Sequence, residues 1–491
     1  MDFLDPKKRR SRNIRLMIGY CLVAIALMLA SILLLFAAFG YGINRTTGEV
    51  TQNGLVFVDA HPEQATMYLN GQDKGGTDGR FVLEAGIYNL ELRRDKYRTW
   101  KRDFVLDGGN IVRMVYPFLF PETLTSRDIY PFSSTPDMVT SSPDRKWIIS
   151  HTPATMTSFQ LTDTSSKELT TTTFTIPQAL LGTRTGEQRM KAVEWSTDNR
   201  HLLVQYTFAG GSDYLIIDRQ SPELSISVSQ TIDSPFVAVT LRDKKPDQIY
   251  IQQSVGGQLI AANTKDRTTA IIAPGVQEFW PYKDNTILYA TTEGAAAEKA
   301  IVKLQDGQVT FNLREVVRGN KYLLNMAEFD GNTYVVAGSA SDGKAYVYKN
   351  PLTALKKTSA APPLQMAILR VDNPIQAIFS ANTRFIALQG GSTFAVYDFE
   401  TKNQYKYDVN LPVEPDYKAT WMDGHRLMLI SGGKMNVFDY DNQNRQGLVD
   451  TSSAYVPAFD RDFNQLFTVG PLQADKAQTG LIRTDLNLGT E

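Results

Sequence analysis

The residues most able to do chemistry in this sequence are few and widely spaced. The four histidines are His61, His151, His201 and His425. None forms an H-x-x-x-H pair or an H-E-x-x-H motif, the spacings that place two imidazoles on one metal. His201 and His425 follow similar polar turns in two copies of an internal repeat, which predicts turn or packing roles. The histidines therefore predict neither a catalytic centre nor a metal site.

An acidic run near the C-terminus has some features of a calcium loop. Residues 439–444 read DYDNQN. An EF-hand loop needs glycine at its sixth position and glutamate at its twelfth, where this chain has Asn444 and Asp450. We interpret the run as a polar turn between strands and predict no bound metal.

Other patterns of catalysis and cofactor binding are also missing. The sequence has no G-x-S-x-G elbow, no P-loop and no strand-linked G-x-G-x-x-G, the motifs that position a nucleophile or cradle phosphates. The lone cysteine, Cys21, allows neither an intrachain disulfide nor a thiolate metal site. We expect no catalytic residue and no cofactor, and predict that the protein is not an enzyme. A binding site built from distant loops stays open.

The five tryptophans could line a ligand face. They are Trp100, Trp147, Trp195, Trp280 and Trp421. Three of them begin or enter strands of the internal repeat, so we expect them to fill the core between repeats.

Charge is placed unevenly along the chain. The first 15 residues carry a net +4, from six basic residues and two aspartates, which leaves −5 for the rest of a chain whose net charge is −1. A mildly acidic body without a basic stripe argues against nucleic-acid binding.

An uncharged apolar segment follows the basic tail, from Leu16 to Phe39. A helix of that length crosses a hydrocarbon layer of ~30 Å. The basic residues before it favour a cytoplasmic N-terminus, and the first residues beyond it offer only Arg45. The topology-setting residues are Lys7, Lys8, Arg9, Arg10, Arg12 and Arg15.

We therefore predict a single-pass cell-membrane protein whose C-terminal domains are extracytoplasmic. The alternative is a cleaved signal peptide, for which Ala38 and Gly40 offer small residues. The apolar run exceeds the 7–15 residues of a signal core, so we favour a retained signal-anchor.

The chain divides into six predicted parts. They are a cytoplasmic basic tail (1–15), a transmembrane helix (16–39), a stalk (40–53), a small β-sandwich (54–120), a β-propeller (121–486) and a tail (487–491). The fold class is thus all-β apart from one N-terminal transmembrane helix.

Residues 54–120 alternate apolar and polar residues in short runs separated by turn signals such as Asn70-Gly71. The segment resembles the PEGA domain, a small β-sandwich common in bacterial and archaeal surface proteins. The resemblance is carried by P-E-Q-A (62–65), M-Y-L-N-G (67–71), G-G-T (75–77), L-E-A-G-I-Y-N-L (83–90) and K-Y (96–97). It implies a surface or adaptor module and brings no catalytic residues.

Three residues depart from the family pattern. Gln64 and Lys96 stand where the family has glycine, and Asp78 stands where proline is common. These departures affect the turns and leave the predicted strand order unchanged.

The rest of the chain carries a weak repeat, in which a polar turn precedes an apolar strand and a second apolar strand often ends on Asp. Clear copies begin at Ser142, Trp195, Phe379 and Trp421, and weaker ones lie near Asp247, Asp284, Asp330 and Asp462. Spacings of about 38–54 residues with several strands per unit are typical of a β-propeller. We predict seven or eight blades.

The segment Ser142-Pro143-Asp144 before an apolar strand resembles the WD40-like propellers of the TolB type. Anchor, PEGA-like unit and propeller together are similar to membrane-anchored surface proteins of candidate-phyla-radiation bacteria, of the Saccharibacteria type.

This architecture, without a catalytic constellation, predicts a binding or scaffolding protein that presents its propeller to protein or glycan ligands at the cell envelope. Two alternatives stay open: a structural envelope component that contacts the cell wall or a surface layer, and a glycan- or peptide-acting enzyme with its site at the propeller mouth. The sequence does not fix the ligand, the oligomeric state, the exposed propeller face, or whether the compartment is the cell surface or the periplasm.

Overall fold

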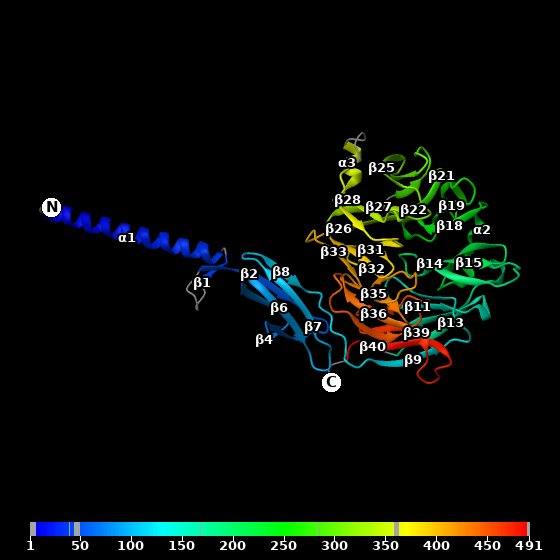
Figure 1. The fold of residues 1–491 in the computed structure, drawn as a ribbon, viewed down its shortest axis with the longest axis horizontal. Helices are drawn as coiled ribbons and strands as arrows, with labels where there is room; N and C mark the ends of the chain where they lie inside the picture. The colour runs from blue at the N-terminus through cyan, green and yellow to red at the C-terminus, as the bar shows by residue number, and fades with distance from the viewer. Residues whose placement is uncertain are drawn as a thin grey trace. The chain divides into compact units, whose positions relative to one another are not determined.

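The computed structural model describes residues 6–38, 40–43, 50–166, 168–283, 285–357 and 363–488. The fold is mostly β-strand with one long N-terminal helix (Figure 1). Two compact units divide the chain, Met1–Thr123 and Leu124–Glu491.

The N-terminal helix α1 spans Pro6–Ala38 and begins ten residues before the predicted apolar segment. Proline suits a first helical turn, and the Lys and Arg residues that follow are good helix formers, so nothing ends the helix within the basic tail. Over Arg12–Phe36 the mean hydropathy is 2.7, and no other helix among the described residues is long and apolar enough to cross a membrane. Phe39 and stalk residues 44–49 lie outside the described residues.

The small unit pairs two four-stranded sheets. In one, the central β2 pairs antiparallel with β1 and β5 and parallel with β8; the other has the order β4-β3-β6-β7. The strands are β1 (Tyr41–Ile43), β2 (Val50–Val58), β3 (Thr66–Leu69), β4 (Gln72–Gly76), β5 (Gly79–Glu84), β6 (Gly86–Arg93), β7 (Trp100–Leu106) and β8 (Ile111–Met114).

Alternation along these strands builds the core of the small unit. Val56 and Val58 of β2 point inward and are fully buried with Met67, Leu90 and Trp100. The residues between them point to the opposite face of their sheet, because successive side chains of a strand alternate. The predicted β-sandwich is confirmed.

The departures from the PEGA pattern fall on turns with left-handed backbone. Gln64 has φ 66°, Asp78 has φ 69° and Lys96 has φ 62°. Glycine reaches this conformation freely, and proline, whose φ is fixed near −65°, cannot adopt it. The turns thus keep the glycine-type geometry although the glycines are gone.

The large unit contains eight four-stranded antiparallel sheets among its described residues, numbered here as blades 1 to 8. Blades 1 to 4 are formed by β10 (Met138–Ser141), β11 (Trp147–His151), β12 (Ser158–Asp163), β13 (Thr170–Thr175); β14 (Arg189–Trp195), β15 (His201–Phe208), β16 (Gly211–Asp218), β17 (Ile226–Ser227); β18 (Phe236–Leu241), β19 (Gln248–Gln253), β20 (Leu259–Asn263), β21 (Thr268–Ala273); and β22 (Val276–Tyr282), β23 (Thr286–Thr291), β24 (Lys299–Asp306), β25 (Val309–Val317).

Blades 5 to 8 follow the same up-and-down order. They are formed by β26 (Tyr322–Phe329), β27 (Asn332–Ser339), β28 (Lys344–Lys349), β29 (Ala367–Arg370); β30 (Gln376–Phe379), β31 (Phe385–Gly390), β32 (Thr393–Asp398), β33 (Gln404–Asp408); β34 (Thr420–Trp421), β35 (Arg426–Ser431), β36 (Lys434–Asp439), β37 (Gln446–Asp450); and β38 (Ala458–Phe459), β39 (Gln465–Pro471), β40 (Thr479–Asp485), β9 (Thr125–Pro131). Short helical pieces connect some strands: η1 (Pro153–Thr155), η2 (Gln178–Leu180), η3 (Pro222–Leu224), α2 (Val228–Thr231), η4 (Arg242–Lys244), η5 (Ala340–Asp342) and α3 (Pro351–Lys357).

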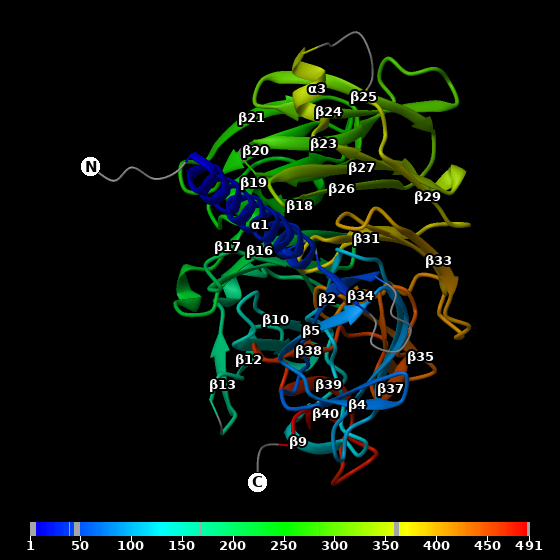
Figure 2. The same ribbon diagram turned by 90° about the vertical axis from the view of Figure 1, so that its left-hand side faces the viewer.

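The two ends of the large unit close it into a ring. Strand β9, from the start of the unit, pairs antiparallel with β40 and completes blade 8. Figure 2 shows the blades following one another in chain order, from teal β10 through green and yellow to red β40. Several first strands of successive blades lie side by side (β10 with β14, β14 with β18, β22 with β26, and β26 with β30), as expected for the inner ring of a propeller. The predicted β-propeller is confirmed, with eight blades.

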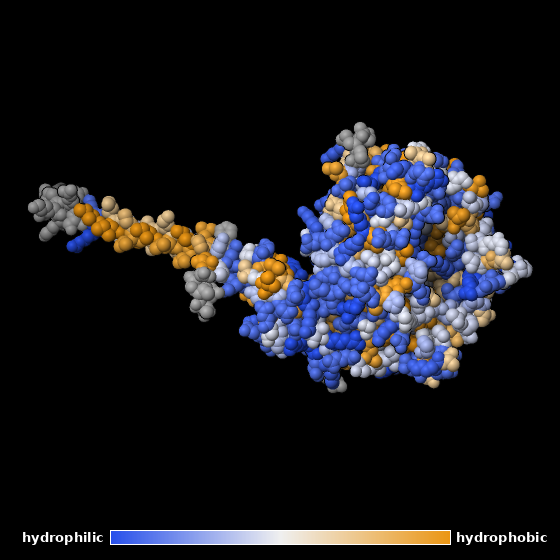
Figure 3. Space-filling view, in the orientation of Figure 1, coloured by the Kyte–Doolittle hydropathy of each residue, from blue (hydrophilic) through white to orange (hydrophobic). Residues whose placement is uncertain are grey.

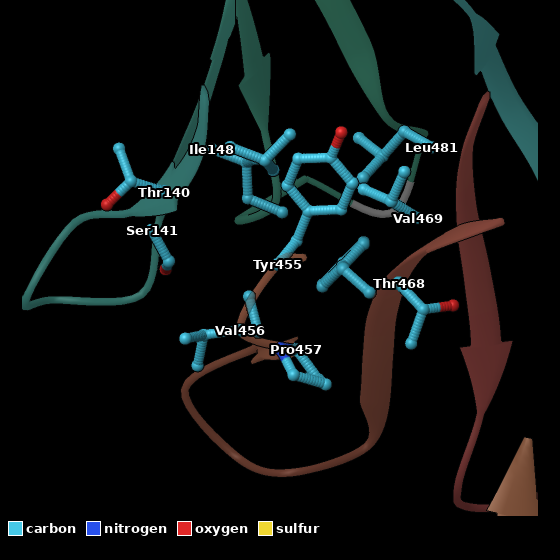
Figure 4. Close-up of a pocket in the computed structure, with 12 residues that line it drawn as sticks. Thr140, Ser141, Ile148, Tyr455, Val456, Pro457, Thr468, Val469 and Leu481 are labelled. Carbon is cyan, nitrogen blue, oxygen red and sulfur yellow. The ribbon is translucent and has the colours of Figure 1, made fainter. Parts of the chain in front are cut away.

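Hydrophobic clusters fill the seams between successive blades, because each sheet has two apolar faces to bury. Between blades 6 and 7 the contacts are aromatic: Phe385 stacks on Tyr440 at 4.2 Å between ring centroids. At the seam of blades 8 and 1, the ring of Tyr455 lies between Ile148 and Leu481 beside a cavity of about 10 Å³ (Figure 4). That cavity has room for about one water molecule.

The repeated polar turn has a physical basis. In blade 1, Ser142 Oγ donates to Asp144 Oδ1 at 2.6 Å and accepts the Trp147 backbone N–H at 3.1 Å. In blade 6, Ser380 Oγ makes the same two bonds, to Asn382 Oδ1 at 2.7 Å and from the Phe385 N–H at 3.1 Å. In each blade the serine hydroxyl thus gives a hydrogen-bond acceptor to the backbone N–H of the first residue of the second strand.

Aspartate at the end of the third strand closes several repeats. Asp398 is fully buried and receives two hydrogen bonds from Arg384, at 2.9 Å from Nε and 2.7 Å from Nη2. Asp218 makes the equivalent pair with Arg200 in blade 2. These buried pairs fix the turn between the third and fourth strands.

Candidate functional site

His151 belongs to a structural pair. Its Nδ1 lies 2.6 Å from Asp137 Oδ1, and the other carboxylate oxygen of Asp137 accepts the Met190 N–H at 2.6 Å. The side chains of His151 and Asp137 are only 0% and 2% exposed. A substrate cannot reach them, and the pair instead joins blade 1 to blade 2.

His201 and His425 occupy equivalent turns but differ by one residue in strand register. His201 is the first residue of β15 and lies opposite Asp218, whereas in blade 7 Arg426 takes that place and His425 precedes it. The predicted match is therefore wrong by one position, because the polar turn of blade 7 is one residue shorter.

The histidines of the propeller do not come together as a catalytic or metal-binding centre. His201 Nδ1 is 2.6 Å from Asp198 Oδ2 at the turn. Burial lowers the pKa of His425 to about 3, which keeps the ring neutral. His61 packs on Phe118 inside the small unit, with ring centroids 4.7 Å apart. The predicted packing roles agree with these contacts.

The acidic run 439–444 forms the turn between β36 and β37. The side-chain amide of Asn444 donates a hydrogen bond to Asp439 Oδ2 at 2.8 Å. The Asn442 backbone N–H donates to the Asp439 carbonyl, also at 2.8 Å. The Asn444 amide therefore occupies the Asp439 carboxylate oxygen that would otherwise be available to bind a cation. No group of three or more His, Cys, Asp or Glu residues among those the structure describes could hold a metal ion.

Two of the repeat tryptophans bridge blades as predicted. Trp195 Nε1 donates to Thr140 of blade 1 at 3.1 Å, and Trp421 Nε1 donates to the Ile378 carbonyl of blade 6 at 3.2 Å. Trp280 differs, since 39% of its surface is exposed. A ligand face made of several tryptophans is not found among these positions.

A cavity of about 500 Å³ lies where the first strands of blades 2 to 4 end. Its lining includes Leu241, Pro281 and Tyr282 with a rim of lysines. Two of these lysines already have acidic partners: Lys244 pairs with Glu194, and Lys283 Nζ lies 3.1 Å from Glu328.

The only carboxylate that lines this cavity, within the described part of the chain, is Asp243. A glycosidase needs two carboxyl groups facing each other across its pocket. This cavity therefore does not supply the pair that the enzyme alternative requires.

Three lysines from separate blades meet at the other end of the ring. Lys191 is in β14 of blade 2, Lys321 directly precedes β26 of blade 5, and Lys418 precedes β34 of blade 7. All three lie at or just before the start of the first strand of their blade, the strand that faces the axis in a propeller.

The charges of the other two lysines act on Lys418. Burial lowers the pKa of Lys418, and the positive charges of Lys321 and Lys191 lower it further. Blades 2, 5 and 7 are not neighbours, so their side chains can act on one another only around the axis. We call these three residues the channel lysines.

Two carboxylates, Glu278 and Asp416, oppose the lowered pKa of Lys418 through their negative charges, and neither makes an ion pair with a channel lysine. Glu278 Oε2 accepts the Tyr322 backbone N–H at 2.6 Å, which ties blade 4 to blade 5. Burial raises the pKa of Glu278, while that hydrogen bond and the charges of Lys321 and Lys418 oppose the rise.

None of the channel lysines makes an ion pair or a side-chain hydrogen bond with any described residue. Three lysines against the two carboxylates of Glu278 and Asp416 leave a net positive charge at this end of the ring, the electrostatic setting that attracts an anion. Sequence reasoning missed these residues, because no local motif marks lysines from three distant blades.

One known domain family matches part of the chain. The PEGA domain pattern matches residues 53–118. Residues 53–118 are a PEGA domain. The strands β2 to β8 described above make up its two sheets. No curated protein matches the chain.

Solved β-propellers resemble the chain at low identity. The Dos1 propeller has a TM-score of 0.46 at 13% identity and covers 75% of this chain and 96% of its own. Sqt1 of Saccharomyces cerevisiae has a TM-score of 0.46 at 10% identity, with 74% and 100% covered. The propeller domain of Myceliophteria thermophila Cps50 (Swd1) has a TM-score of 0.40 at 10% identity, with 68% and 100% covered.

Proposed function

We propose that this chain is a membrane-anchored, exported binding protein whose propeller takes the acidic groups of a protein or glycan ligand at the bacterial cell envelope. In this proposal α1 is a retained signal-anchor. The basic residues from Lys7 to Arg15 hold the N-terminus in the cytoplasm, and the PEGA domain and propeller are extracytoplasmic.

The observation that carries the proposal is the set of unpaired channel lysines. The ammonium groups of Lys321 and Lys191 repel that of Lys418, and none of the three makes an ion pair with a described residue. An anion placed among them replaces that repulsion by attraction.

The proposal also predicts how ligand binding depends on pH. An anion beside Lys418 favours its charged form, so binding raises a pKa that burial and the neighbouring lysines lower. Ligand binding is then coupled to proton uptake, and the affinity should fall as the pH rises through the lowered pKa.

The test uses the full chain in lipid nanodiscs and two defined polymers, poly-L-glutamate for the protein class and polygalacturonate for the glycan class. Replacing the channel lysines together (K191Q/K321Q/K418Q) should weaken binding at low salt by at least about tenfold. The control variant K265Q/K349Q/K406Q removes the same charge from exposed lysines of other strands and turns, and should change the affinity less than about twofold.

Binding of only one polymer would assign the ligand class. Equal loss in the two triple variants would mean that net charge alone attracts the polymers, and binding of neither polymer by the wild type would remove the proposal.

A further inference from the structure

One outer face of the PEGA domain carries an exposed apolar row. Leu55 of β2 lies opposite Val82 of β5 on one side and opposite Ile111 of β8 on the other. Val82 is 60% and Ile111 57% exposed, and Leu55 is half-buried between them. Figure 3 shows orange side chains at the end of the small unit where β2 and β8 lie. Contiguous apolar residues of this kind mark an interaction surface.

The next row on the same face is basic. Phe57 lies opposite Arg80 and opposite Arg113, two residues further along each strand from the apolar row. Arg113 covers the ring of Phe57 at 5.1 Å, and both arginines are exposed. Neither arginine makes an ion pair with a described residue. We call Val82, Leu55, Ile111, Arg80 and Arg113 the docking face.

The docking face begins next to the end of α1. The Asn53 N–H donates to the Gly40 carbonyl at 2.8 Å, just beyond the last helical residue, Ala38. Leu55 follows Asn53 by two strand residues, a distance of ~7 Å. Whatever the direction of β2, the apolar row therefore lies within about that distance of the point where the chain leaves the helix.

We propose that the docking face of the PEGA domain rests on the surface of an anionic lipid bilayer, the same bilayer that holds α1. The polar zone on each side of a bilayer is ~5–8 Å thick, which matches the distance from the helix end to the apolar row. With β2 lying along the bilayer surface, the apolar row enters the headgroup region, and Arg80 and Arg113 contact lipid phosphates. This inference rests on the proposed membrane anchor.

The charges argue for lipid rather than for a purely apolar partner. On the same face, Glu84 lies opposite Asn53, on the other side of the apolar row from the arginines. Two free guanidinium groups beside an apolar row suit a surface that is apolar below and anionic above.

The other sheet of the sandwich supplies a matched control. Its outer face exposes Ile87 and Val105, which lie opposite each other and are 76% and 62% exposed. The adjacent pair is Asn89 and Asp103, joined by a hydrogen bond of 2.7 Å, so no arginine borders this apolar pair. The two faces are similarly apolar but differ in charge and in distance from the helix end.

The experiment uses site-directed labels on the full chain in vesicles of 70% zwitterionic and 30% anionic phospholipid. Because Cys21 is the lone cysteine, a Cys21→Ser background accepts a fluorophore at Val82→Cys, Ile111→Cys or Val105→Cys. Lipids with a quencher near the headgroup should quench positions 82 and 111 at least threefold more than position 105. The excess should disappear in R80Q/R113Q and shrink in wholly zwitterionic vesicles.

A separate label tests the anchor itself. A fluorophore on native Cys21 should be quenched by lipids that carry the quencher deep in the acyl chains. Quenching at position 21 with equal quenching at 82 and 105 would overturn the docking face and leave the anchor intact. No quenching at position 21 would remove the anchor and the docking face together. A blue-shifted signal at 82 that lipid does not quench would assign the face to a protein partner or a second copy, against this proposal.

Discussion

The PEGA domain and the propeller bury their apolar residues in different ways. The PEGA domain has two sheets and one core between them, so each sheet keeps an outer face, and both outer faces expose apolar residues in cross-strand rows. In the propeller each sheet has neighbours on both faces, and its exposed large apolar residues, such as Val255 and Leu364, are scattered singly.

This difference separates ordinary surface features from those that indicate a binding partner. Single exposed apolar residues are normal on a protein surface, whereas contiguous rows mark contacts. The PEGA domain leaves apolar rows uncovered, and the propeller leaves unpaired lysines in its channel. We therefore assign a lipid surface to the first and an acidic ligand to the second.

The largest expected effect tests burial in the propeller seams. Phe385 is fully buried and stacks on Tyr440 across the seam of blades 6 and 7. Phe385→Ala should lower the free energy of unfolding by about 3–5 kcal/mol, through lost apolar burial and the cavity left behind. Denaturant unfolding followed by tryptophan fluorescence measures it. The control is Ile87→Ala on the outer face of the PEGA domain, expected to cost less than about 0.5 kcal/mol. Similar losses for the two variants would break the comparison.

The second prediction concerns the aspartate that ends the third strand of a blade. Asp398→Asn should destabilise the propeller by up to about 3 kcal/mol, because Arg384 would lose its fully buried partner and keep only the exposed carboxylate of Glu400. Asp306 ends the third strand of blade 4 and pairs with Lys356 at the surface. Asp306→Asn should therefore cost less than about 1 kcal/mol. The same denaturant titration compares them, and equal costs would show that burial does not decide the worth of these pairs.

The third prediction is a pH dependence. Burial lowers the pKa of His425 to about 3 in the folded state. The positive charges of Arg426 and Arg384 add to this lowering, and the negative charges of Asp423 and Asp398 oppose it. The unfolded chain takes up a proton near pH 6.5, and the folded chain does not until about pH 3. His425 thus makes stability fall as the pH drops below ~6.5, by about 2 kcal/mol between pH 8 and pH 5.

Unfolding titrations of wild type and His425→Gln at pH 8 and pH 5 measure this difference. The variant should lose about 2 kcal/mol less than the wild type over that range. An identical pH profile for both proteins would contradict the buried neutral histidine.

The smallest effect is expected at a turn of the PEGA domain, where the change should stabilise. Lys96 has φ 62°, a conformation that costs a side-chain-bearing residue more than glycine. Lys96→Gly should raise the stability of the PEGA domain by about 0.5–1 kcal/mol, seen as a higher thermal midpoint. Asn70→Gly, at φ 50°, should gain nothing, because asparagine tolerates this region and its Oδ1 accepts the Asn89 N–H at 2.8 Å. A loss of stability in Lys96→Gly would mean that its side chain contributes more than the turn costs.

Local signals in the sequence predicted most of the fold. Ser142, Ser380 and Asp398 mark the turns of the repeat because each satisfies nearby backbone or a nearby arginine. The weak copies near Asp247, Asp330 and Asp462 fall between first and second strands of blades 3, 5 and 8, and Asp284 lies outside the described residues.

The sites could not be predicted in the same way. The channel lysines come from three distant blades and meet only once the ring closes. The docking face depends on the parallel pairing of β2 with β8, which no local pattern in either strand specifies. The register of His425 was missed because one residue is deleted from an otherwise similar turn.

The most direct test of the account is protease shaving of intact cells that express the protein with a different tag at each end. An exported PEGA domain and propeller held by α1 predict loss of the C-terminal tag and survival of the N-terminal tag, after opening of an outer membrane where one is present. Protection of both tags after every outer barrier is opened would contradict the account, because the channel lysines and the docking face would then lie on the wrong side of the membrane.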